Sequence, residues 1–383
     1  MDFTLGDEQL ALQEAARRLF ADRVPLDGLG ATADATDPAD AADAKLWAEI
    51  VRLGFVGMAG EGGDFTLDAV LLEEAGYALA PVPLLSTAVA SPAVVRVSGD
   101  GPVAATVAWA EPPGSDGSDG SDGSVGSGGS GADAFGPGEQ VRVRASVVDG
   151  GERLDGRKVD VPDLQLAEQL VVLARLDDQP TACVVRLSTA DGAPGMQVSY
   201  QPTLDGTRRV AHVDLVDVPA VAVPGSAVVA SIRRRALAGL ALESVGVAQR
   251  ALELAVTHAS TREQFGRPIG SYQAVSHRIA DVYVAVELAR SLAYRATFWV
   301  AAAESADGAA LAAEVDGACA AAKAAAGDAA VRACEMLIQV LGGMGMTWEH
   351  PAHRLYKRAL ANRAYGGTPA AHRASIAAGL LDG

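Results

Sequence analysis

The side chains best suited to bind a charged ligand lie in a short polar stretch between two long apolar segments. This stretch runs from Thr261 to Gln273 and reads T-R-E-Q-F-G-R-P-I-G-S-Y-Q. Arginine, glutamine and aromatic side chains lie close together at a predicted helix junction, where exposed helix-end amides and a cation favour an anionic ligand. An ordinary turn, with Gly266 and Pro268 ending the helix and Arg262 in solvent, fits the same residues. Taken alone, the stretch leaves both interpretations open.

A second stretch, further along the chain, favours the ligand site. Residues 339–351 read Q-V-L-G-G-M-G-M-T-W-E-H-P, and Tyr365-Gly-Gly-Thr368 follows. Together the patterns R-x-x-F-G-x-P-I-x-x-x-Q and Q-x-x-G-G-x-G-x-x-x-E-x-P resemble the acyl-CoA dehydrogenase superfamily, flavoproteins that oxidise acyl-CoA thioesters to 2,3-enoyl-CoA. The C-terminal half matches this family without evident gaps, and the N-terminal half matches more loosely.

The resemblance implies FAD as the cofactor and assigns residues to it. Glycines let backbone amides approach a phosphate closely, and an arginine offers a fork to a pyrophosphate. Read one by one, the glycines are equally compatible with a helix C-cap. The residues that the resemblance places on FAD, partly that of a neighbouring subunit, are Arg262, Gln264, Phe265, Gln273, Gln339, Gly342, Gly343 and Thr368.

The catalytic base is the main departure from the family. Desaturation of a thioester requires a carboxylate at the α-proton and a hydride acceptor at the β-carbon, held in a dry site. The family's commonest base is a Glu between the Tyr and Gly of Y-E-G-T, where this chain has Gly366, and a second known position falls at Ala236. Neither residue can accept a proton.

Glu243, two turns beyond Ala236, is the remaining candidate base. It shares a helical face with Gly239 and Gly246, so the predicted helix presents an open surface that could hold a substrate. Some actinobacterial relatives that act on bulky acyl groups carry A-x-E-x-x-G on this helix. The alternative is that Glu243 pairs with an arginine across the bundle and that the glycines permit close helix packing.

The segment that should face the flavin ring also departs from the family. Trp109-Ala-Glu-Pro resembles the family's flavin-edge strand, but Val159-Asp-Val161 stands where W-I-T/S is usual, and a Gly/Ser/Asp tract at residues 114–131 replaces an ordered loop. Our leading hypothesis is a FAD-dependent acyl-CoA dehydrogenase for a bulky acyl group with Glu243 as base. One alternative is a non-catalytic partner subunit of a heteromeric acyl-CoA dehydrogenase, and another is a different flavin chemistry on the same fold.

Composition excludes several other classes. The chain has 383 residues and a formal net charge of −17, so nucleic acid and anionic membranes, which require a basic face, are not expected partners. Three widely spaced cysteines form neither a disulfide framework nor a metal pattern, and the histidines lack ligand spacing. No secretory signal or bilayer-length apolar run is evident, so we expect a cytoplasmic protein.

The elements that must position these residues indicate an α+β fold in the order of the family. We expect an N-terminal helical domain at 1–100, a β-domain of barrel or sandwich type at 101–225 with antiparallel strands and a flexible loop at 114–131, and a C-terminal four-helix bundle at 226–383. Leu154-Asp-Gly-Arg157 is predicted to form a hairpin turn. Because family FAD sites take groups from two chains, we expect a homodimer, homotetramer or heterotetramer that uses an acyl-CoA substrate and an electron-transfer acceptor.

Overall fold

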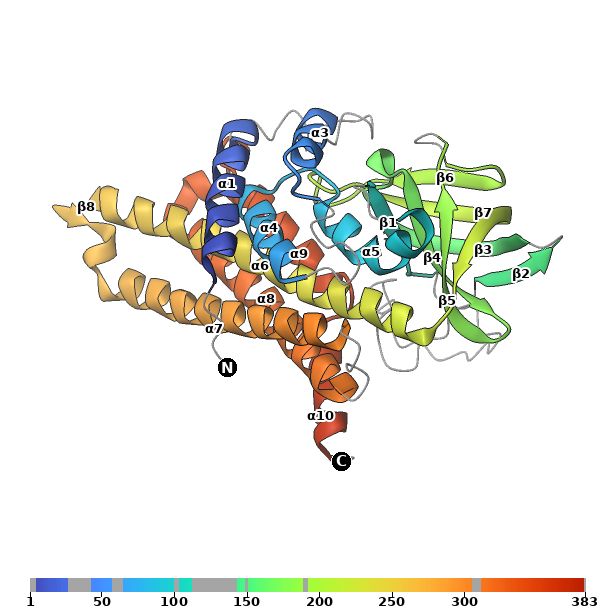
Figure 1. Cartoon of the computed structure of the whole chain (residues 1–383). Coiled ribbons are helices and arrows are strands. Elements are labelled where there is room, and N and C mark those ends of the chain that lie inside the picture. Colours follow the sequence, from blue (N-terminus) through green and yellow to red (C-terminus); the bar gives the residue numbers. More distant parts are fainter. Residues whose placement is uncertain are drawn as a thin grey trace, which may run out of the picture.

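The computed structural model describes residues 5–26, 43–56, 65–99, 103–111, 143–148, 151–188, 192–304 and 311–381. Figure 1 shows the long helices of the C-terminal half lying side by side, with shorter N-terminal helices packed on them and a β-domain at one end. The predicted flexible loop at 114–131 lies outside the described residues. Among the described helices, none is long and apolar enough to cross a membrane.

The N-terminal domain is helical, as predicted. Helix α1 begins after Gly6 with Asp7 and Glu8 in its first turn, where carboxylates complement the helix dipole. Asp43 caps the second helix, since its side chain accepts a hydrogen bond from the backbone N–H of Leu46 at 2.8 Å. The described helices here are α1 (Asp7–Arg23), α3 (Ala44–Arg52), α4 (Phe65–Ala78) and α5 (Leu84–Ser98).

The β-domain is a closed barrel. Around the ring, β4 pairs with β2, β2 with β3, β3 with β7, β7 with β5, and β5 with β4, while β1 adds to β4 and β6 adds to β7. Side chains of β4 alternate between the interior of the barrel, where Leu170 and Val172 lie, and the helical core, where Val171 and Leu173 lie. The strands are β1 (Ala105–Ala108), β2 (Arg144–Val148), β3 (Gly151–Pro162), β4 (Gln169–Leu176), β5 (Gln179–Arg186), β6 (Met196–Gln201) and β7 (Val210–Val223).

Two details of the predicted β-domain are wrong. The β1 and β4 strands run parallel, with Ala105 opposite Gln169, so the sheet is mixed rather than antiparallel. Residues 154–157, which were predicted to form a hairpin turn, instead lie within strand β3. Strands β2 and β3 pair earlier in the sequence, with Val148 opposite Gly151. The positive φ of Gly156 (139°) serves a shift of register against β7 instead.

The C-terminal domain is a bundle built around α8 (Ala312–Leu341). Helices α6 (Ser226–Thr261) and α7 (Gln273–Glu304) pack against it, and the bundle prediction is confirmed. Two shorter helices complete this part, namely α9 (Ala352–Ala364) and α10 (Pro369–Leu381). A single apolar core runs through the N-terminal helices, the bundle and the outer face of the barrel.

Candidate functional site

The predicted cofactor residues all lie on the surface of the chain, in three places. The first group is at the α6–α7 junction, the second at the end of α8 and the third in the turn between α9 and α10. No described contact joins the three groups, so a ligand that touches all of them must bridge them or involve a second chain. The exposed residues are Arg262, Gln264, Phe265, Gln273, Gln339, Gly342, Gly343 and Thr368.

At the α6–α7 junction the chain forms a small hairpin that projects beyond the bundle (Figure 1). Strands β8 (Glu263–Gln264) and β9 (Arg267–Pro268) pair across it, and the ring of Phe265 is 94% exposed. The hydroxyl of Tyr272 donates to the carbonyl oxygen of Gln264 at 3.1 Å, which fixes the hairpin on the first residues before α7. An ordered hairpin that presents an arginine, amides and an uncovered aromatic ring suits a nucleotide.

The Gly-Gly pair at the end of α8 presents an unobstructed backbone. Gly342 adopts a positive φ of 62°, which favours glycine, and a Cβ at either Gly342 or Gly343 would meet no other atom within 4 Å. The backbone N–H of Gly342 donates to the carbonyl oxygen of Ile338, so these glycines also fit an ordinary helix C-cap. These two residues therefore fit the close approach of a phosphate without requiring it.

The turn between α9 and α10 contains the position of the family's usual base. Gly366 and Gly367 have φ values of 74° and 101°. Ahead of them, the ring of Tyr365 packs on Trp109 of the barrel at a centroid distance of 5.0 Å, and its hydroxyl donates to the carbonyl of Asp160 at 2.9 Å. The segment at 159–161, where the family contacts the flavin ring, is thus joined directly to this turn.

Glu243 lies in the interior, within a cluster of charged side chains between the barrel and the bundle. Its side chain is 3% exposed and accepts hydrogen bonds from Nη2 of Arg208 at 2.8 and 2.9 Å and from Nη1 of Arg358. Arg358 also donates to Asp205 and Thr207. Both oxygens of Glu243 are therefore already occupied by guanidinium groups.

The electrostatics of this cluster keep Glu243 charged. Burial opposes the charged form, but Arg208 and Arg358 outweigh it, so the pKa of Glu243 lies below its usual value. Asp205 behaves in the same way, whereas burial raises the pKa of Asp163, which accepts a hydrogen bond from Ser86 at 2.5 Å. A carboxylate with a lowered pKa and two fixed cationic donors is a weak proton acceptor.

The glycine-rich face of α6 is covered, so the predicted open surface is wrong. A Cβ at Gly246 would overlap the carbonyl of Glu73, and a Cβ at Gly76 of α4 would overlap the carbonyl of Glu243. Gly239 likewise faces Leu85, whose Cδ1 would lie 2.5 Å from an added Cβ. The glycines permit close packing of α4 and α5 on α6, as the alternative interpretation proposed. The catalytic role of Glu243 stays a prediction.

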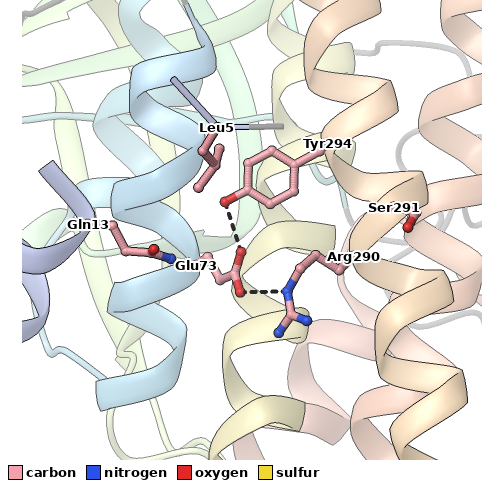
Figure 2. Close-up of a pocket in the computed structure, with 6 residues that line it drawn as sticks. All are labelled: Leu5, Gln13, Glu73, Arg290, Ser291 and Tyr294. Atoms are coloured by element: carbon pink, nitrogen blue, oxygen red, sulfur yellow. Dashed lines mark hydrogen bonds and ion pairs between the residues drawn. The ribbon is translucent and has the colours of Figure 1, made fainter. Parts of the chain in front are cut away.

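A cavity of about 190 Å³ lies elsewhere, between the N-terminal segment and α7, and Figure 2 shows its lining. Glu73 accepts hydrogen bonds there from Nε of Arg290 at 3.1 Å and from the hydroxyl of Tyr294 at 2.9 Å. Arg290 in turn donates to Glu287 and to Gln249. Because these polar groups satisfy each other, the cavity offers no charged group in need of a ligand.

Sequence reasoning did not find the partners of Glu243. Arg208 lies in the loop between β6 and β7, and Arg358 lies on α9, 35 and 115 residues from Glu243. Spacing gives no signal at such separations. Among the described residues, no group of three or more metal-ligating side chains forms a candidate metal site.

Comparison with known proteins supports the same fold. Residues 233–381 match the family model of the acyl-CoA dehydrogenase C-terminal domain. The acyl-CoA dehydrogenase IpdE2 of Mycobacterium tuberculosis is 31% identical over 303 residues, which cover 79% of this chain and 74% of that protein. A variant of the Tcur3481-Tcur3483 steroid acyl-CoA dehydrogenase has a TM-score of 0.81 at 30% identity over 99% of both chains. The ChsE4-ChsE5 complex from Mycobacterium tuberculosis has the same fold, with a TM-score of 0.81 at 24% identity over 100% of both chains.

Proposed function

The chain belongs to the acyl-CoA dehydrogenase family, and from this we propose that it is one of two dissimilar subunits of a FAD-dependent acyl-CoA dehydrogenase. In this proposal it contributes nucleotide-binding groups to a shared site, and its partner subunit supplies the catalytic base. The chemistry of the assembly is the oxidation of an acyl-CoA thioester to the 2,3-enoyl-CoA, with FAD as hydride acceptor.

The observation that supports this proposal best is the state of Glu243. A general base must reach the α-proton of its substrate and must have a pKa near the working pH. Glu243 is sealed between the barrel and the bundle, and its oxygens are engaged by Arg208 and Arg358. The family's two base positions hold Gly366 and Ala236, which carry no carboxylate. In the part of the chain that the structure describes, none of these three positions therefore offers a carboxylate that is free to accept a proton.

A second line of support is the outward orientation of the predicted cofactor residues. Arg262 and the Gly342-Gly343 pair are exposed, as expected for groups that contact a nucleotide held partly by another chain. The place where this chain would hold a flavin ring is instead bridged by Tyr365, which contacts both Trp109 and Asp160. These residues fit the adenosine and phosphate portion of FAD and do not fit its ring system.

The relatives agree with a paired assembly and suggest the substrate class. The Tcur3481-Tcur3483 protein, 30% identical to this chain, is named as a steroid acyl-CoA dehydrogenase with two components, and ChsE4-ChsE5 is named as a complex. We extend both features to this chain, with a bulky, ring-bearing acyl-CoA as substrate. The hypothesis of an independent homo-oligomeric enzyme with Glu243 as base remains the second candidate, favoured by the family relationship to IpdE2.

Flavin content and assembly state separate these two candidates. The chain would be purified alone and together with each candidate acyl-CoA dehydrogenase subunit of the same organism, with flavin absorbance and mass by light scattering as readouts. We expect a chain that retains little flavin alone and a yellow hetero-oligomer that is bleached by an acyl-CoA. A homo-oligomer with one FAD per chain that an acyl-CoA reduces would refute the partner-subunit proposal.

A further inference from the structure

Lys323 of α8 is a completely buried lysine beneath the turn that joins α9 to α10. Its side chain is 0% exposed, and its Nζ donates to two backbone carbonyls, those of Arg363 and Gly367, each at 3.3 Å. His372 of α10 completes the contact from the other side, since its Nε2 lies 3.0 Å from the carbonyl of Gly366. Two ionisable side chains from two helices thus contact three backbone carbonyls, one in the last turn of α9 and two in the turn that follows it.

The arrangement is not explained by packing alone. A buried ammonium with only carbonyl partners is unfavourable, and an apolar side chain of similar length would fill the space without that cost. Of the charged groups around Lys323, Arg363 of α9 opposes its charge and Asp328 of α8 favours it, while Arg373 of α10 pairs with Asp328. Burial, followed by Arg363, lowers the pKa of Lys323 to about 7.

The carbonyls that Lys323 binds determine the path of the chain into Thr368. The carbonyl of Arg363 lies in the last turn of α9, where the helix dipole favours a cation, and that of Gly367 directly precedes Thr368. The two glycines of the turn have positive φ and little intrinsic stiffness. Immediately after them, Thr368 begins α10, with its Oγ1 accepting from the backbone N–H of Ala371 at 3.2 Å.

We propose that Lys323, assisted by His372, is the positioning residue of the Tyr365–Thr368 turn and sets the place of Thr368 in the nucleotide site. The inference rests on the proposed function for its ligand, FAD, but its structural part concerns this chain alone. Lys323 acts through the turn backbone and touches no ligand itself.

A double-mutant cycle on the full chain, alone and in its flavin-bearing assembly, tests the proposal. We expect Lys323→Met to weaken FAD binding, measured by flavin fluorescence titration, about tenfold, since two hydrogen bonds from a charged donor are lost. Thr368→Ala should weaken FAD binding to a similar degree. The double variant should lose about tenfold in affinity rather than about a hundredfold, because both changes remove the same contact between Thr368 and FAD. Lys45→Met, at an exposed lysine of α3, is the matched control and should leave FAD affinity unchanged.

Hydrogen exchange supplies a readout that does not depend on the cofactor. In Lys323→Met without FAD, the backbone amides of residues 366–368 and 370–372 should exchange at least tenfold faster, while those of α8 stay protected. The melting temperature should respond to pH in a defined direction. Between about pH 7 and 10.5 the unfolded chain binds more protons at Lys323 than the folded chain, so the stability of the wild type should rise with pH relative to Lys323→Met.

The outcomes are distinguishable. Unchanged FAD affinity in Lys323→Met, or additive effects with Thr368→Ala, would overturn the positioning role while leaving the proposed function intact. If no preparation binds FAD, the proposed function fails, and the exchange experiment alone decides the role of Lys323: a loosened turn supports it, and an unchanged turn overturns it.

Discussion

Replacement of Glu243 by Gln distinguishes the structural role of this residue from a catalytic one. The substitution keeps the size and one hydrogen-bond acceptor of the side chain but removes its charge. In the folded chain it leaves Arg358 paired with Asp205, and Arg208 with Asp163 at 3.9 Å, a carboxyl whose pKa burial raises. The amide NH₂ of the new side chain must also face a guanidinium group, with which it can form no hydrogen bond.

The expected cost follows from the burial of this cluster. Removal of one partner of a buried ion pair costs about 3–5 kcal/mol, because the other charge stays buried without compensation. Glu243 and Arg358 are 3% and 1% exposed, so solvent provides little relief. An unfolding entropy of about 2.1 cal/mol/K per residue gives roughly 1.2 °C per kcal/mol for 383 residues, so the melting temperature should fall by about 4–6 °C.

Thermal melting and flavin reduction measured on the same samples form the assay, with Glu314→Gln as control. Glu314 is exposed on α8, and the same chemical change there should cost less than about 0.5 kcal/mol. We expect Glu243→Gln to lower stability while the rate of flavin reduction per folded assembly stays within about threefold. Unchanged melting combined with a hundredfold loss of rate would identify Glu243 as the base and refute our reasoning.

Three further predictions concern packing and burial in other parts of the chain as well as in this cluster. Leucine at both Arg358 and Glu243 should destabilise the chain by less than the sum of the single changes, since the double variant leaves fewer unpaired charges, and a melting-based cycle measures this. Gly246→Ala should cost several kcal/mol or abolish folding, because its Cβ would overlap the carbonyl of Glu73, whereas Gly317→Ala, with open space around it, should raise the melting temperature slightly. A thiol reagent should label the native chain at none of its buried cysteines and at all three after denaturation, because burial raises the pKa of each thiol, and for Cys183 to about 12; the residues are Cys183, Cys319 and Cys334.

The sequence alone determined the order of the domains and the long helices. Apolar residues recur at helical spacing over 30 or more residues in α6, α7 and α8, so no single unfavourable residue changes the prediction of a helix there. The residues at which α6 and α8 end, Arg262 and Gly342, also lie in recognisable turn sequences. The family patterns lie on these junctions, which is why candidate cofactor residues could be named before the fold was known.

Short elements were harder to predict because local signals conflict there. Helix α5 contains Pro92 and follows Pro83, residues that argue against a helix, yet nine of its residues are buried against α6 and the barrel. The Asp-Gly pair at Gly156 carries the signal of a hairpin turn, but its positive φ serves an irregularity within β3. In both places, tertiary packing overrides local preference.

Tertiary structure alone decided the surroundings of Glu243. The sequence showed one carboxylate and several glycines on a helical face, a pattern that suits both a substrate pocket and close packing. Only the fold brings Arg208 from the barrel and Arg358 from α9 to that carboxylate, and only the fold places α4 over the glycines. Glu243 is 35 positions from Arg208 and 115 positions from Arg358 in the sequence. Contacts at such separations depend on how whole domains pack together, and no local spacing encodes them.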